Sequence, residues 1–397
     1  MQSELREPGV PVAEGVVPLS VPNISGNEWR YVKECLDSGW VSSAGDFVDR
    51  FERGFADAVG APHAVAMASG TAALHVALLV AGVQPGDEVI VPSLTFIAPA
   101  NAVRYIGAWP VFVDVDADYW QLDPTAVEAF LADRCQRVAD ELRNRRTGRR
   151  VKAILPVDLL GTPVDLERLT SIAAEYGLAM VEDATESLGS TRGPHRIGGR
   201  GAPSCFSFNG NKLLTTGGGG MVTTGEEALA KRVRYLATQA KVDPIEFVHG
   251  DVGFNYRLTN VQAAIGCAQL EQLDAFVAVK RRVAGRYAEA LGSLPGVTLM
   301  RDPPWGRSVF WLYTVLFDAS VFGRDSRALM RALEDSGVQT RPLWQPLHCS
   351  PAHEGSDAGP CPTAERLQRD ALSLPCSTGI TQPEQERVIE AILKAAP

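Results

Sequence analysis

The sequence predicts an α/β protein with a mostly parallel central sheet and a smaller C-terminal α+β domain. Short apolar runs alternate with helical segments over residues 60–240, and parallel strands need such crossover connections. Residues 258–290 form one long helical stretch with little Gly or Pro, and the composition changes after Gly296. With 397 residues, 45% of them hydrophobic, the chain is large enough to bury more than one core.

Residues 1–24 are the first predicted segment, an arm rich in Pro and Val that is expected to cross the surface. Apolar side chains then recur at helical spacing from Asn27 to Gly39, and a second amphipathic helix begins near Asp46. These helices open a large domain over residues 25–285, and residues 286–397 form the small domain.

The large domain starts its sheet with a strand, a tight turn and a helix. The run His63–Met67 ends at Ser69-Gly70-Thr71, and a helix of small and apolar residues follows over Ala72–Leu79. In sheets of this kind, ligands bind beyond the carboxyl ends of the strands. Further strands are expected over residues 88–91, 109–114, 152–157, 178–183, 204–208 and 220–224, with helices over 101–106 and 165–176.

The small domain has a different order of elements. Val309–Phe317 predicts a strand, Ser326–Ser336 a helix, and Pro351–Pro362 a polar loop. A basic cluster lies earlier in the chain, over residues 134–152. A solvated face of helix and loop is the favoured interpretation of this cluster, and a docking patch is the alternative.

Composition disfavours several classes of protein. The chain has 38 Lys and Arg against 47 Asp and Glu, a formal net charge of −9, which argues against a dedicated binder of nucleic acid or of anionic membranes. Its 7 cysteines show neither metal-ligand spacing nor a disulfide framework, so we expect a reducing compartment and no metal site. The N-terminus lacks a signal-peptide pattern and no run of about 18 apolar residues occurs, so a cytoplasmic protein is expected.

Three features carry chemistry. Ser69-Gly70-Thr71 opens a helix, where backbone N–H groups and the helix dipole attract phosphate, although small residues also occur there for packing. Asp183 ends an apolar strand, where it is either a ligand or a helix cap. Lys212 lies between apolar residues and the run Gly217–Gly220, and desolvation favours the neutral amine that forms a Schiff base.

Together these features point to pyridoxal 5′-phosphate as the cofactor. The turn at Gly70 and Thr71 would hold the phosphate, Lys212 the aldehyde, and Asp183 the protonated pyridine nitrogen that makes the ring an electron sink. Phe96 follows the strand 88–91, where it either stacks on the cofactor ring or packs in the core. The sequence therefore predicts an enzyme that uses this cofactor.

The motifs SGTAALHVAL (69–78), VEDATESLGS (181–190), SFNGNKLLTTGGGGM (207–221) and GFNYRLTNVQAAIGCAQLEQLD (253–274) occur in this order. They resemble the sugar aminotransferases of the DegT/DnrJ/EryC1/StrS group. The resemblance implies pyridoxal phosphate fold type I, the architecture of aspartate aminotransferase. It also implies a homodimer whose active sites are shared between subunits.

The resemblance assigns roles to individual residues. Lys212 and Asp183 are the expected catalytic residues, Glu186 lies near the ring hydroxyl, and Phe96 stacks on the ring. Asn255 is expected to reach the cofactor phosphate of the neighbouring subunit, with Arg257 nearby. The expected phosphate ligands are Gly70, Thr71 and Ser207. The expected substrate-side residues, with loop packing as the alternative, are Trp40, Ser42, Arg341, Trp344 and His348.

One position departs from the family pattern. Many relatives have a histidine where this chain has Asp158, so any role of that histidine beside the cofactor or substrate is open here. Lys212 is present, which counts against the related sugar dehydratases, in which a histidine replaces the lysine.

Residues 25–52 and 207–220 resemble the branch that aminates nucleotide-linked 4-keto-6-deoxy-N-acetylhexosamines, as in the bacillosamine and legionaminic acid pathways. The resemblance implies L-glutamate as amino donor, a UDP-linked sugar as acceptor, and a place in polysaccharide biosynthesis. Other acceptors of the family are the alternatives, namely a 3-keto sugar, an inosose or an aminobenzoate precursor. A further alternative is a regulatory protein that keeps the fold without turnover.

Overall fold

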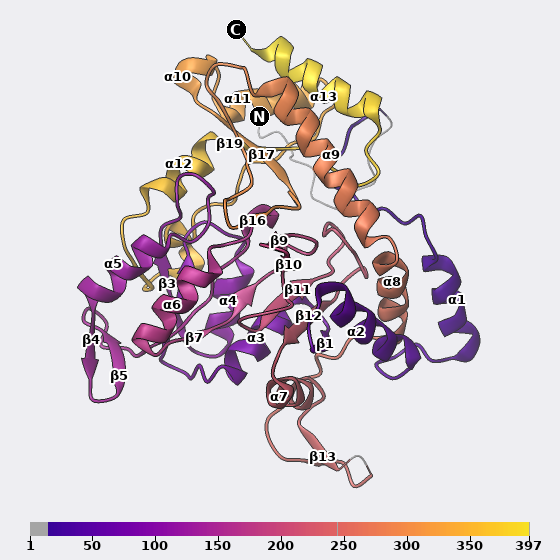
Figure 1. Ribbon diagram of the computed structural model, residues 1–397, viewed down its shortest axis with the longest axis vertical. Helices are drawn as coiled ribbons and strands as arrows, with labels where there is room; N and C mark the ends of the chain where they lie inside the picture. The colour runs from indigo at the N-terminus through magenta and orange to yellow at the C-terminus, as the bar shows by residue number, and fades with distance from the viewer. Residues whose placement is uncertain (1–14, 244, 397) are drawn as a thin grey trace.

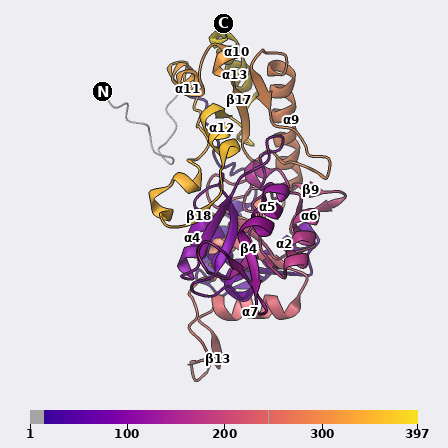
Figure 2. The ribbon, with the colours of Figure 1, turned by 90° about the vertical axis from the view of Figure 1, so that its left-hand side faces the viewer.

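The computed structural model describes residues 15–243 and 245–396, so most of the predicted N-terminal arm lies outside the described residues. Figure 1 shows a larger α/β part and a smaller part that meet along helix α9 (Leu273–Leu291), and Figure 2 shows the same arrangement from the side. The proposed domain boundary near residue 285 therefore falls inside a helix that belongs to both parts.

The central sheet of the large part is mostly parallel, as predicted. A 5-stranded ladder is parallel throughout, with the order β18-β3-β2-β6-β7. Crossover helices connect its strands, and this arrangement places every carboxyl end at the same edge. The strands are β18 (Asp357–Ala358), β3 (Trp109–Val113), β2 (Glu88–Pro92), β6 (Val151–Ile154) and β7 (Ala179–Met180).

A 4-stranded ladder continues this sheet in the order β8-β11-β12-β1. Strand β11 runs parallel to β8, whereas β12 is antiparallel to both of its neighbours. The two ladders meet where Asp183 pairs with Val157, so the strand predicted over 178–183 is divided between them. The strands are β8 (Glu182–Asp183), β11 (Ser204–Ser207), β12 (Gly220–Thr224) and β1 (His63–Met67).

Helix α3 (Gly70–Val80) is the most deeply buried helix at this sheet. Leu74, His75, Val76 and Leu78 are all buried, although they point to different sides of the helix. Its small and apolar sequence follows from this position between the sheet and neighbouring helices. The other helices of the large part are α1 (Glu28–Ser38), α2 (Asp46–Val59), α4 (Ala98–Tyr105), α5 (Pro124–Arg134), α6 (Leu166–Tyr176) and α7 (Glu227–Ala237).

The prediction of a single helical stretch over residues 258–290 is wrong, because two helices lie there. Helix α8 (Asn260–Leu270) ends before α9 begins, and the N–H of Gln272 donates to the carbonyl of Gln269, a tightened turn. The side chains of both glutamines also donate to Glu28 Oε1, at 2.5 and 3.2 Å. These contacts to α1 hold the break in place.

The small part contains the antiparallel sheet β15-β17-β19. The strand predicted from Val309 begins only at Tyr313, because the preceding residues cross to the large part and Phe310 has a φ of 53°. The loop predicted over 351–362 contains strand β18, which joins the large sheet. The elements are β15 (Val297–Leu299), β17 (Tyr313–Phe317), β19 (Ala371–Leu374), α10 (Ala319–Phe322), α11 (Ser326–Asp335), α12 (Pro362–Asp370) and α13 (Gln382–Ala395).

The basic cluster is a hairpin of β4 (Cys135–Val138) and β5 (Glu141–Asn144), not a helix and loop. Several of its arginines pair with carboxylates of the large part. Arg146 lies 2.5 Å from buried Asp357, and Arg150 lies 2.6 Å from Asp87. These ion pairs favour a structural role over a docking patch.

A second hairpin projects from the large part below α7 in both views (Figures 1 and 2). It consists of β13 (Lys241–Asp243) and β14 (Val248–His249). Val242, Phe247 and Val252 are exposed on or beside it. Among the helices that the structure describes, none is long and apolar enough to cross a membrane.

Candidate active site

Lys212 lies in the loop that follows β11, at the carboxyl end of that strand. Its Nζ lies 3.4 Å from Glu186 Oε1 and 3.9 Å from the centroid of the Trp311 ring system. The lysine side chain is only 13% exposed. The amine is therefore held between a carboxylate and an aromatic face.

Asp183 ends strand β8 and is fully buried. The backbone N–H of Thr185 donates to its Oδ1 at 3.0 Å. Burial raises the pKa of Asp183 to about 6, opposed by the hydrogen bonds of Thr185 and the charge of Lys212. No Lys, Arg or His among the described residues forms an ion pair with this carboxylate, which is the environment that a protonated pyridine nitrogen completes.

Glu186 is buried beside Lys212 and is oriented from behind. Its Oε2 accepts a hydrogen bond of 2.7 Å from the N–H of Leu160, whose φ of 58° is unusual for a side chain of this size. Gln121 fixes that turn by hydrogen bonds to both the N–H and the carbonyl of Leu159. Burial raises the pKa of Glu186, and the charge of Lys212 opposes this shift.

The start of α3 meets strand β11 in a tight cradle. Ser69 caps the helix by accepting from Ala72 N, and this leaves the first-turn N–H groups of Gly70 and Thr71 without partners inside the helix. A Cβ added to Gly70 would lie 2.7 Å from the Cβ of Ser207. Two predicted phosphate ligands from distant parts of the chain therefore meet at a helix N-terminus.

Phe96 and Trp344 lie together at the junction of the two parts. Phe96 follows β2, is 49% exposed, and makes an edge-to-face contact with Trp344 at 6.0 Å between ring centroids. His348 Nδ1 lies 2.5 Å from Ser93 Oγ, beside the same strand end. Arg341 lies farther back along this segment, where its backbone pairs with Ser373 of β19.

Trp40, Ser42 and Asn255 lie on a different surface within one chain. Trp40 is 60% exposed, and the carbonyls of Trp40 and Ser42 accept hydrogen bonds from Asn260. Asn255 is exposed, and its backbone pairs with Thr238. In the part of the chain that the structure describes, no hydrogen bond or ion pair joins these three residues to Lys212.

Asp158 has several partners within the chain, including Arg192 at 3.3 Å. It is fully buried, and it accepts hydrogen bonds from Val164 N at 2.8 Å and Ser187 Oγ at 2.6 Å. Burial and the nearby charge of Glu182 raise its pKa to about 8. These contacts assign Asp158 to the support of the turn that reaches Glu186.

His348 also lies near Glu365 and Cys349, the usual chemistry of a zinc ligand set. One ligand atom from each lies within 4.8 Å of the others, but Cys349 and Glu365 are exposed and His348 Nε2 already pairs with Glu365 Oε1 at 3.1 Å. Among the described residues no further His, Cys, Asp or Glu joins this group.

The sequence reasoning missed Trp311, Leu160 and Thr185. Thr185 lies two residues after Asp183 in the same motif, so its position beside that carboxylate could have been predicted. Trp311 lies in a run that predicts a strand, and Leu160 adopts its conformation only because Gln121 holds the turn. No local pattern in the sequence indicates the roles of Trp311 and Leu160.

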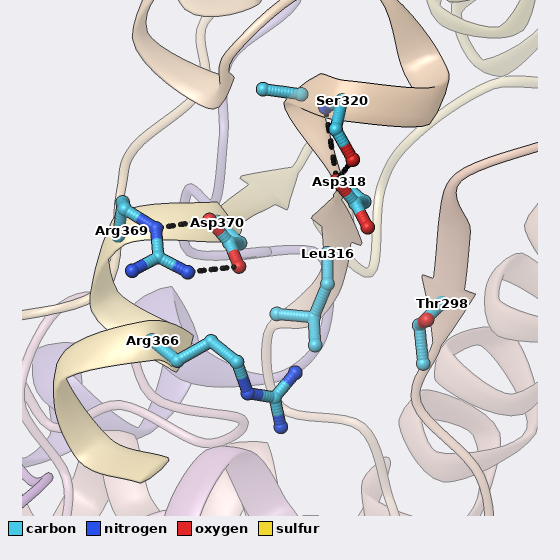
Figure 3. Close-up of a pocket in the computed structure, with 8 residues that line it drawn as sticks. Thr298, Leu316, Asp318, Ser320, Arg366, Arg369 and Asp370 are labelled. Carbon is cyan, nitrogen blue, oxygen red and sulfur yellow. Dashed lines mark hydrogen bonds and ion pairs between the residues drawn. The ribbon is translucent and has the colours of Figure 1, made fainter. Parts of the chain in front are cut away.

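A hollow of about 380 Å³ lies elsewhere, on the surface of the small part (Figure 3). Four of its polar side chains bond to one another: Arg369 pairs with Asp370 through two hydrogen bonds, and Ser320 donates to Asp318. Arg366 extends below Leu316 in Figure 3. The hollow shares no lining residue with the predicted site, so the residues around Lys212 are the candidate active site.

Comparison with known proteins gives consistent results. The model of the DegT/DnrJ/EryC1/StrS aminotransferase family matches residues 22–393. The GDP-perosamine synthase of Caulobacter vibrioides is 41% identical over 378 residues, which are 95% of this chain and 97% of that protein. The putative pyridoxal phosphate-dependent aminotransferase EpsN of Bacillus subtilis is 38% identical over 383 residues, 94% of each chain.

Solved structures confirm the expected fold. The aminotransferase TlmJ of Streptoalloteichus hindustanus superposes with a TM-score of 0.86 at 31% identity, covering 96% of this chain and 98% of that one. DesV of S. venezuelae, in complex with a ketimine intermediate, superposes with a TM-score of 0.83 at 34% identity, covering 93% and 94%. The architecture is that of pyridoxal phosphate-dependent sugar aminotransferases.

Proposed function

The chain belongs to the DegT/DnrJ/EryC1/StrS aminotransferase family, and we propose that it transfers an amino group from L-glutamate to a nucleotide-linked 4-keto-6-deoxyhexose. It is a sugar aminotransferase that depends on pyridoxal phosphate. The observation that supports the proposal best is the meeting of Lys212, Glu186 and the uncompensated Asp183 at the carboxyl ends of the strands.

The proposal also covers the identity of the nucleotide that carries the acceptor sugar. The sequence favours a UDP-linked N-acetylhexosamine, whereas relatives with 41%, 36% and 32% identity are named GDP-perosamine synthases. Those relatives cover 95% of this chain. We therefore put a GDP-linked keto-sugar first, and a UDP-linked N-acetylhexosamine is the competing acceptor.

When bound, pyridoxal phosphate supplies an aldehyde that captures an amine and a ring that draws electrons from the neighbouring carbon. Lys212 Nζ would hold that aldehyde and, when free, would carry the proton to and from the substrate carbon. The buried Asp183 carboxylate would keep the ring nitrogen protonated, because a positive charge there would balance its own. Glu186 lies 3.4 Å from Lys212 Nζ and would orient the free amine.

The remaining groups bind and orient. The first-turn N–H groups of Gly70 and Thr71 and the hydroxyl of Ser207 donate to the phosphate at the positive end of α3. Phe96 is proposed to cover the ring. Arg341, Trp344 and His348 are proposed to face the acceptor, and the contact of Trp344 with Phe96 supports this role for Trp344.

A homodimer with shared sites is part of the proposal. Asn255 is exposed, and Arg257 Nε is buried without a hydrogen-bond partner within one chain. The hairpin β13–β14 also exposes Phe247 and Val252, at 67% and 88% of their surfaces. A second copy of the chain would bury this apolar surface and bring Asn255, Trp40 and Ser42 to the neighbouring cofactor.

The test is incubation of the holoenzyme with L-glutamate and a panel of keto acceptors, followed by mass spectrometry. The panel contains GDP-linked and UDP-linked 4-keto sugars, a 3-keto sugar, an inosose and an aminobenzoate precursor. Conversion of a nucleotide-linked 4-ketone to the amine, with parallel initial-rate lines for the two substrates, supports the proposal. Conversion of a different acceptor alone, or of none, contradicts it.

A further inference from the structure

We infer that Trp311 is a positioning residue for Lys212 and that it joins the amine to the acceptor side of the site. This inference rests on the proposed roles of Lys212 and Trp344. It is carried by the contacts of one buried side chain, which is 2% exposed and lies in the segment that crosses to the large part just before β17.

Trp311 contacts the amine of Lys212 and the backbone of the residue before it. Its ring face lies 3.9 Å from Lys212 Nζ, and its indole N–H donates to the carbonyl of Asn211 at 2.8 Å. The electron-rich face of an indole attracts an ammonium group, and its N–H is a donor in the ring plane. One side chain thus fixes both the terminal amine and the backbone that precedes it.

Trp311 is itself held rigidly. Lys280 of α9 is buried and donates from Nζ to the carbonyl of Trp311 at 2.7 Å and to the carbonyl of Cys376 at 2.6 Å. A Cβ added to Gly161, whose φ is 88°, would lie 2.8 Å from Trp311 N and 3.0 Å from the carbonyl of Glu186. The turn that orients Glu186 therefore also packs against Trp311, and the two residues that flank the amine share one support.

Trp311 also packs beside Trp344, one of the proposed acceptor-side residues. Its ring system is parallel to that of Trp344, with 9° between planes and 6.5 Å between centroids, and Trp344 contacts Phe96. A shift of Trp344 would therefore act on the residue that aims the amine. The same ring face would stabilise the positive charge that the nitrogen of Lys212 carries.

The experiment compares Trp311→Leu, Trp311→Phe and the control Trp305→Leu in the holoenzyme. Trp305 also donates an indole hydrogen bond, of 2.9 Å to the Pro163 carbonyl, and its ring contacts Tyr119 rather than Lys212. The readouts are the pH midpoint of the visible absorption of the bound cofactor and the single-turnover rate constant with L-glutamate. Circular dichroism and thermal melting establish that each variant is folded.

For Trp311→Leu we expect the rate constant to fall about 100-fold, the effect of a misplacement of about 1 Å, while the apparent affinity for glutamate stays within about threefold. The absorption midpoint falls by about 0.5 pH unit, since loss of the ring face destabilises the cationic nitrogen. Trp311→Phe keeps a ring but loses the Asn211 bond, so its midpoint stays near that of the original protein and its rate falls about 10-fold. Trp305→Leu changes neither readout.

A rate for Trp311→Leu that equals that of Trp305→Leu, or an unchanged midpoint, overturns the inference. If Trp311→Leu does not fold, Trp311→Phe decides alone: a slowed rate supports the inference and an unchanged rate overturns it. A holoenzyme that glutamate does not bleach refutes the proposed function. The absorption midpoints of the variants still test the link between Trp311 and Lys212 in that case.

Discussion

Two groups of buried carboxylates lie at opposite ends of the same sheet. Glu88 and Asp357 lie at the amino ends of β2 and β18, and Asp183 lies at the carboxyl end of β8. The amino-end group is saturated: Asn144 donates to both Glu88 and Asp357, Thr147 donates to Glu88, and Arg146 pairs with Asp357.

The carboxyl-end group lacks this compensation. Among the described residues, Lys212 is the cation whose charge acts on both Asp183 and Glu186, and its Nζ lies 3.4 Å from Glu186 Oε1. The same residue types therefore stabilise the fold at one end and leave electrostatic demand at the other. A positively charged ring nitrogen would meet that demand, and this is our reason for proposing the cofactor site at this end.

Removal of the amine should give the largest effect on catalysis. Lys212→Ala is expected to lower kcat by at least about 1,000-fold, because both the covalent anchor and the proton carrier are lost. Steady-state assays measure the change, with exposed Lys231→Ala as the matched control. Multiple turnovers at the normal rate in Lys212→Ala would remove the lysine from the mechanism.

Removal of the uncompensated charge should come next. Asp183→Asn is expected to lower kcat by about 100-fold, because a neutral amide no longer keeps the ring nitrogen protonated. Asp357→Asn at the amino end should keep the kcat of the folded enzyme. Equal losses of kcat in these two variants would show that the two ends of the sheet do not differ as described.

In the cofactor-free protein, burial of the Asp183 carboxyl group should make the unfolding free energy depend on pH. Burial raises the pKa of Asp183 from 3.8 to about 6, so the proton binds more tightly in the folded chain. The stability that the protonated Asp183 carboxyl group contributes is fully present below pH 3.8 and is lost as the pH rises to about 6.

The unfolding free energy of Asp183→Asn, relative to that of the original apoprotein, should therefore rise with pH. The gain should reach up to about 3 kcal/mol above a pH of about 6. Urea unfolding at pH 4 and pH 7 measures this gain. The same difference at both pH values would contradict the assignment of the shift to this carboxyl group.

Breaking a pair at the amino end should affect stability without affecting chemistry. Arg150→Met removes the two hydrogen bonds of 2.8 and 2.6 Å that Arg150 donates to buried Asp87 and leaves it only the bond from the N–H of Gln84 among the described residues, so we expect a loss of about 2 kcal/mol in unfolding free energy. The kcat of the folded fraction should stay the same. A fall in kcat without a fall in stability would reverse the contrast between the two ends.

The smallest expected effect is on cofactor affinity at the cradle. Gly70→Ala introduces a Cβ at 2.7 Å from Ser207 Cβ, so the phosphate ligands must separate, and the Kd for pyridoxal phosphate should rise about 10-fold. Fluorescence titration of the apoprotein measures this, with Gly285→Ala, where the added Cβ has open space, as control. Equal affinities in both variants would exclude the cradle as the phosphate site.

Part of the signal for the carboxyl-end group is local in the sequence. Asp183 follows an apolar strand pattern and Lys212 lies beside a glycine run, whereas Glu186 was expected only from the family resemblance. Trp311 was not predicted, because its role depends on contacts to residues that are far away in the chain, such as Asn211 and Lys280. The break between α8 and α9 was missed for the same reason, since Glu28 fixes it.

The central claim is that the carboxyl end of the sheet holds pyridoxal phosphate on Lys212. The most direct measurement is borohydride reduction of the holoenzyme, followed by proteolysis and mass spectrometry of the peptides. We expect the reduced cofactor on the peptide that contains Lys212 and on no other lysine. Cofactor on a different lysine, or on none, would contradict the account.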